Sequence, residues 1–136
     1  MITVNIWGII VASIVAFIIG ALWYSPLLFG KEWMSLIGMN DRDITAAKNK
    51  GMTKYYIIQL IVTLITFTVL GFAIAGLSIT TAQDAGFIGL LAWIGFVVPG
   101  AVGSLIWERR PFKLIVINSV GTLVCWVIGA AIIGMW

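Results

Sequence analysis

The sequence contains no histidine and a single cysteine, Cys125, among its 136 residues. The missing histidine removes the commonest general base, metal ligand and proton shuttle. One cysteine can form neither an intramolecular disulfide nor a thiolate metal cluster, and in an apolar segment it is typical of a small buried hydrophobe. We therefore expect no metal, no cofactor and no catalytic activity.

Charge is scarce as well, with eight basic and five acidic residues and a net charge of +3. Soluble domains carry about 25% charged and about 45–50% apolar residues. Here only 10% of the residues are charged and 62% are hydrophobic. The basic residues are spread over short loops and do not form the stripe that nucleic-acid binding requires. The composition indicates a membrane protein whose partners are lipids, with no nucleic-acid partner.

Four long apolar segments predict four transmembrane helices, at about residues 2–24, 55–77, 86–107 and 112–136. A helix of this length measures roughly 33–37 Å, enough to cross a hydrocarbon core of about 30 Å. Within these segments the only charged residue is Lys113, near the start of the last one. We expect residues 1–136 to form one all-α integral membrane domain with a loop at residues 25–54.

Basic residues are divided unequally between the loops. Five lie after the first span, three lie around the turn after the third span, and none lies after the second: Lys31, Arg42, Lys48, Lys50 and Lys54, then Arg109, Arg110 and Lys113. Short loops rich in Lys and Arg remain in the cytoplasm. The distribution predicts a multi-pass protein of the cell inner (plasma) membrane with both termini outside.

Helix-capping residues predict two short helices in the loop after the first span and the start of the third span. Ser25-Pro26 is typical of an N-cap followed by proline at the first helical position, which predicts an interfacial helix at residues 27–36. Asn40 as an N-cap and Gly51 as a terminator predict a second loop helix between them. The Thr81-Ala82-Gln83-Asp84 segment resembles a capping box and predicts the start of the third span.

Small residues recur every four positions on two spans. They are Gly8, Ala12, Ala16 and Gly20 on the first span and Gly121, Cys125 and Gly129 on the last. Such a face lets a second helix backbone approach closely. Two interpretations stay open, namely packing between the helices of one chain and the interface of a homo-oligomer.

Uncharged polar residues also recur at helical spacing. They are Gln59, Thr63 and Thr66 on the second span and Asn118 and Thr122 on the last. They either form interhelical hydrogen bonds or line a path or pocket for a small solute of unknown identity. An amide in hydrocarbon needs a partner, and we expect Gln59 and Asn118 to pair with each other. In the third span, Pro99 predicts a kink.

Several motifs resemble those of a known family. One runs from the first span into the loop and comprises Trp23, Tyr24, Ser25, Pro26, Phe29, Gly30 and Trp33. Others are Gly89–Phe96, Glu108 with Arg110, Ile117-Asn118 and the terminal Gly134-Met135-Trp136. Together they resemble the prokaryotic membrane family known as domain of unknown function 1761 over nearly the whole chain. The resemblance implies a small multi-span protein without an established activity, and it transfers no catalytic residue.

Three classes of function follow from these observations. An enzyme would have to use charged residues at the cytoplasmic surface, namely Asp41, Asp43, Glu108 and Arg109. A passive channel or facilitator would use the polar residues of the second and fourth spans. We favour a non-catalytic membrane component, such as an oligomeric scaffold, a lipid-interacting protein or an accessory subunit.

Overall fold

The computed structural model describes residues 2–136, so Met1, which belongs to the expected domain, lies outside the described residues. Within residues 2–136, four helices are long and apolar enough to span a membrane: α1 (Ile6–Trp23), α4 (Thr53–Gly76), a third built from α5 (Ala82–Ala92), η1 (Trp93–Val97) and α6 (Val98–Ile106), and α7 (Phe112–Met135). Two short helices, α2 (Gly30–Ile37) and α3 (Asp41–Lys50), connect α1 to α4. The predicted all-α fold with four spans is confirmed, with boundaries that agree within four residues.

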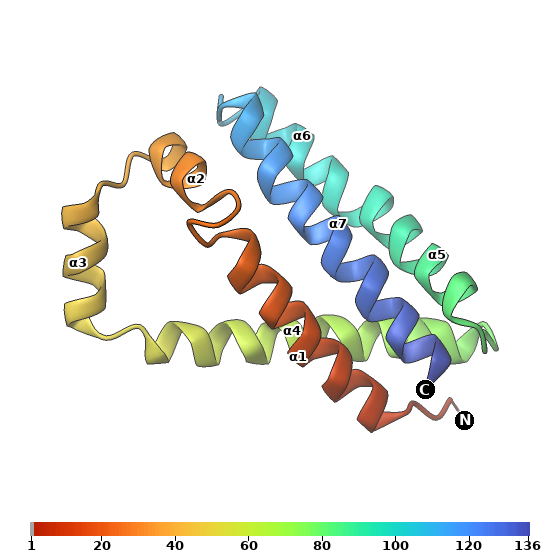
Figure 1. Cartoon of the computed structure of the whole chain (residues 1–136). Coiled ribbons are helices and arrows are strands. Elements are labelled where there is room, and N and C mark those ends of the chain that lie inside the picture. The colour runs from red at the N-terminus through yellow and green to blue at the C-terminus, as the bar shows by residue number, and fades with distance from the viewer. Residues whose placement is uncertain (1) are drawn as a thin grey trace.

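The last helix, α7, lies at the centre of the bundle. It packs along α5 and α6 on one side and along α1 on the other, while α4 crosses α1 and α7 at a steep angle (Figure 1). The two termini and the α4–α5 turn lie at one end of the bundle. At the other end lie α2, α3 and the turn at residues 107–111. We call this second end the basic end, because all eight Lys and Arg residues lie in or beside these segments.

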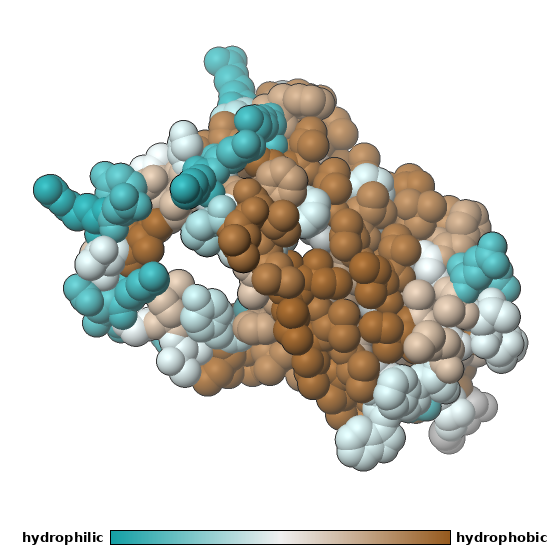
Figure 2. Space-filling model, in the orientation of Figure 1, coloured by the Kyte–Doolittle hydropathy of each residue, from teal (hydrophilic) through white to brown (hydrophobic). Residues whose placement is uncertain are grey.

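The core of the bundle is small and is built largely from small side chains. Ala12 and Ala130 are fully buried, and Phe67 is the largest side chain with almost no exposure. Most large hydrophobic residues of the spans point outward instead, and Figure 2 shows them as a continuous apolar surface beside the charged basic end. Lipid tails solvate such a surface, so these side chains need no protein partner.

Capping by Asn40 and Thr81 agrees with the predictions, whereas the start of α2 does not. The Asn40 side chain accepts a hydrogen bond from the Asp43 N–H at 2.9 Å, and the Thr81 hydroxyl accepts one from the Asp84 N–H at 3.2 Å. Instead of capping, the Ser25 hydroxyl donates to the Leu22 carbonyl at 2.7 Å. The helix expected at residues 27–36 therefore begins later, at Gly30, after a turn.

The disruption expected at Pro99 takes the form of a π-helical turn. The five residues of η1 precede Val98, whose N–H donates to the carbonyl of Trp93. Proline has no N–H, and its ring clashes with the carbonyl four residues earlier in a regular helix. A wider turn relieves that clash without ending the span.

The α4 helix packs against its own chain along only half of its length. Its buried residues all fall between Phe67 and Ile74. In the preceding half, the ring of Tyr56 lies edge-on to Phe17, with 6.3 Å between the ring centroids. Figure 1 shows this half running away from α7, and Figure 2 shows an open space between α3 and the body of the bundle. The first half of α4 is thus largely free of protein contacts within the chain.

Candidate functional site

The family-like motif folds into one compact structure at the basic end, which we call the aromatic turn (Trp23–Trp33). The rings of Trp23 and Phe29 lie 4.7 Å apart between centroids, and those of Tyr24 and Trp33 lie 5.2 Å apart. The Phe29 N–H donates to the Trp23 carbonyl at 3.0 Å. A side chain at Gly30 would begin 2.5 Å from the Tyr24 carbonyl oxygen, which explains why glycine stands there.

The aromatic turn is anchored to α7 by side-chain hydrogen bonds. The Trp23 indole N–H donates to the Ile117 carbonyl at 2.9 Å, and the Tyr24 hydroxyl donates to Asn118 Oδ1 at 2.8 Å. Burial raises the pKa of the Tyr24 phenol, so the phenol remains a donor at neutral pH. An ion pair between Lys113 and Glu32, at 3.1 Å, joins α2 to α7. The motif therefore positions Asn118.

The expected pairing of Gln59 with Asn118 is wrong. Asn118 accepts its hydrogen bond from Tyr24, while Gln59 Nε2 lies 3.4 Å from the hydroxyl of Thr63 in its own helix. The cause is the course of α4, which diverges from α7 in the half that carries Gln59. The position of each residue along its own span can be counted from the sequence, but it does not show that the two helices diverge.

The predicted polar residues fall on two separate surfaces. Each threonine hydroxyl donates to a carbonyl one turn earlier: Thr63 to Gln59 at 2.7 Å, Thr66 to Val62 at 3.2 Å and Thr122 to Asn118 at 3.0 Å. Asn118 and Thr122 face a groove shared with α6, and no residue of α4 lines that groove. Within one chain, the two polar stripes therefore do not form a common path.

The groove between α6 and α7 reaches Arg110 near the basic end and has a volume of about 220 Å³. Five of its nine lining residues are polar: Ser104, Arg110, Asn118, Ser119 and Thr122. Next to it, the Trp93 indole N–H donates to the Ser119 carbonyl at 2.8 Å and fixes η1 against α7. Ser104, Ser119 and the groove-lining position of Arg110 were not predicted from the sequence, because isolated residues of these types carry no periodic signal.

The small-residue faces contribute to packing within the chain. Ala12 and Ala16 are buried, and the Cys125 thiol lies 3.6 Å from the Ala16 carbonyl. A methyl group at Gly129 would overlap the Phe67 ring. At Gly20, by contrast, a methyl group would meet no atom of the chain within 4 Å. These contacts support the interpretation of packing between helices of one chain for all of these residues except Gly20.

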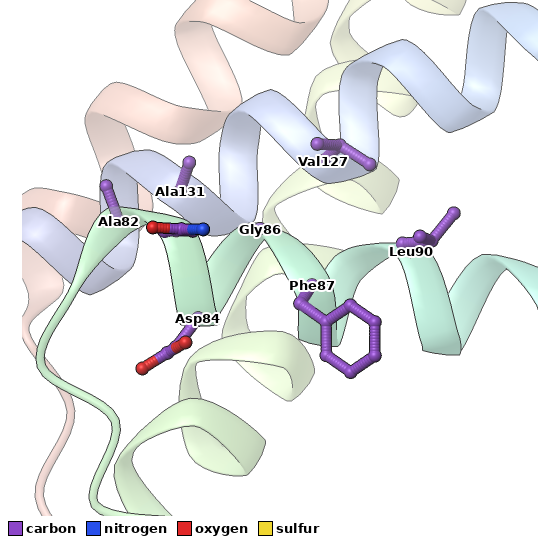
Figure 3. A pocket seen from close by; sticks show the side chains of 8 residues that line it. Ala82, Asp84, Gly86, Phe87, Leu90, Val127 and Ala131 are labelled. Carbon is purple, nitrogen blue, oxygen red and sulfur yellow. The ribbon is translucent and has the colours of Figure 1, made fainter.

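A second, larger groove of about 570 Å³ lies between α5 and α7 near the opposite end (Figure 3). Its lining is mostly apolar, and Figure 3 shows the Asp84 carboxylate pointing away from Val127 and Ala131. Binding sites for polar ligands need several converging polar groups. The α6–α7 groove has them, and it is therefore the stronger candidate.

The chain matches the model of a protein family described as "Protein of unknown function (DUF1761)". The match covers residues 7–134 and therefore includes both the aromatic turn and the α6–α7 groove. No curated protein and no solved structure matches.

Proposed function

The chain belongs to the DUF1761 family, and we propose that it acts as a non-catalytic membrane component that assembles into a homo-oligomer through the first half of α4. The observation that carries this proposal is the environment of Gln59. This residue is exposed, and along the helix axis it lies roughly 6 Å further into the span than Tyr55, at 1.5 Å per residue. Its half of α4 has few contacts with the rest of the chain.

An exposed amide within a span favours a protein partner. An unpaired amide in hydrocarbon costs several kcal/mol. The 3.4 Å contact with Thr63 uses one donor of Gln59, and Gln59 Oε1 accepts no hydrogen bond within residues 2–136. A glutamine carries both a donor and an acceptor, so it is complementary to the same glutamine of a second copy related by a two-fold axis. A second copy would satisfy both groups at once.

The arrangement of charge supports the non-catalytic part of the proposal. Every charged side chain of the described residues lies between spans or within the first three residues of a span. Intramembrane chemistry and ion transport usually rely on an ionisable group inside the bundle. A structural or accessory role requires none.

The same charges support an orientation in the cell inner membrane. All eight basic residues gather at the basic end, and the turn between α4 and α5 has none. We propose that the basic end faces the cytoplasm and that both termini face outward. Reporters active in only one compartment, fused to the C-terminus, test this: an active cytoplasmic reporter would contradict the orientation.

Disulfide trapping in native membranes tests the oligomer. In a Cys125→Ala background that keeps Gln59, Val62→Cys should form a cross-linked dimer under mild oxidation, because Val62 lies one turn after Gln59 and is 48% exposed. The matched control is Val69→Cys, because Val69 is 63% exposed on the same helix but lies in the half that packs against its own chain. Equal cross-linking of Val62→Cys and Val69→Cys, or none with Val62→Cys, would refute assembly through this surface.

A further inference from the structure

We propose that the α6–α7 groove binds the phosphate group of an anionic phospholipid. The polar lining of this groove consists mainly of hydrogen-bond donors. Asn118 Oδ1 is occupied by the Tyr24 hydroxyl, so the two Nδ2 hydrogens are left as donors. The guanidinium of Arg110 and the hydroxyls of Ser104 and Ser119 add further donors. Because no carboxylate lines the groove, the site favours an anion.

The charge at the mouth of the groove fits a phosphate. Arg110 uses its Nε to bind Glu108 at 3.0 Å, and both side chains are more than half exposed. The guanidinium therefore has terminal N–H groups available for a second anion, and a guanidinium can bind phosphate through two parallel hydrogen bonds. Basic pockets between membrane helices bind anionic lipid headgroups in this way.

The apolar part of the groove fits the remainder of a lipid. Val97, Gly100, Ala101 and Ile115 complete the lining, and each of them is partly or fully exposed. A methyl group added at Gly100 or Gly103 would meet no atom of the chain within 4 Å, so neither glycine is needed for packing within the chain. The volume of about 220 Å³ suits a headgroup rather than a whole lipid, whose tails would remain in the bilayer.

The alternative ligand with the same phosphate group is free inorganic phosphate. A soluble anion would reach the groove from the aqueous side, whereas a lipid would enter sideways between α6 and α7. The lipid is favoured because the groove lies along the third and fourth spans and Gly100 in its lining is exposed, so a ligand in the groove would contact the bilayer. This site and the α4 surface share no residue, so each proposal can fail without the other.

Lipid binding by the full-length protein in detergent, measured by native mass spectrometry, tests the proposal. Phosphatidylglycerol should bind the wild type more tightly than phosphatidylcholine. Arg110→Gln should weaken phosphatidylglycerol binding about tenfold, the effect of losing a hydrogen bond to a charged group. Arg109→Gln is the matched control: it removes the same charge from the neighbouring residue, which does not line the groove, and should change binding less than twofold.

A second pair of variants leaves the charge unchanged. Ala101→Leu fills the groove and should weaken phosphatidylglycerol binding, whereas Val102→Leu, on the exposed surface, should not. If Arg110→Gln fails to fold, the two leucine variants still test whether the lipid binds in the groove. Equal effects of Arg109→Gln and Arg110→Gln, together with no difference between the leucine variants, would overturn the site. Binding of inorganic phosphate without lipid, with displacement of phosphatidylglycerol, would overturn the lipid as its ligand.

Discussion

Replacing Gly129 by alanine should destabilise the bundle, although alanine is the better helix former. The added methyl group would overlap the ring of Phe67, which is 1% exposed and packs from α4 against α7. Overpacking of this kind costs about 1–3 kcal/mol, and the gain in helix propensity of about 0.5–1 kcal/mol offsets only part of it. We expect a net loss of up to about 2.5 kcal/mol in the free energy of unfolding.

Gly103→Ala is the matched control, because a methyl group there meets no atom of the chain within 4 Å. This variant should gain about 0.5–1 kcal/mol from the higher helix propensity of alanine and should suffer no clash. The assay is unfolding of each variant in mixed micelles, with helicity followed by circular dichroism. Phe67→Leu should partly rescue Gly129→Ala, so that the double variant loses less than the sum of the single changes. Equal stability of the two alanine variants would refute the argument.

Two further predictions concern the turns. Ser78 follows α4 with φ of 57°, in the left-handed region, so Ser78→Gly should raise the free energy of unfolding by about 1 kcal/mol; a lower thermal midpoint would contradict this. Tyr24→Phe should cost about 1 kcal/mol at neutral pH through the lost bond to Asn118. Because burial raises the pKa of Tyr24 above 10.0, the unfolded state ionises first. Wild-type stability should therefore fall more steeply than that of Tyr24→Phe as pH rises past 10, and parallel pH profiles would disprove this.

Most of the fold could be predicted from the hydropathy of the sequence and from its helix-capping residues. The four spans follow from apolar length, and the helix after Asn40 follows from side chains that bind their own backbone nearby. Contacts between helices were not predictable in this way. The partner of Asn118 depends on how α4 crosses the bundle, and that crossing depends on where Phe67 meets Gly129, a contact between residues 62 positions apart.

The start of α2 was mispredicted for a different reason. Ser25-Pro26 is compatible with both a helix start and a turn, and local preferences do not separate the two. The contact between the tilted rings of Trp23 and Phe29 and the hydrogen bond from Trp23 to α7 select the turn. A motif can thus be recognised from sequence while its conformation is decided by contacts that only the folded chain makes.

The π-helical turn has a consequence for the whole third span, because it shifts the angular phase of every residue that follows. Gly86 and Gly89 contact α7, and Gly100 and Gly103 follow them 14 residues later. Fourteen residues are nearly four turns at 3.6 residues per turn, so an uninterrupted α-helix would present all four glycines along one stripe. The wider turn changes the rotation about the helix axis between the two pairs, and a methyl group at Gly100 or Gly103 meets no atom of the chain within 4 Å. Because a π-helical turn holds one extra residue, deleting one residue from η1 would give a regular α-helix and leave α6 in its present orientation, whereas an uninterrupted α-helix of the same length would turn Gly100 and Gly103 onto the side of Gly86 and Gly89.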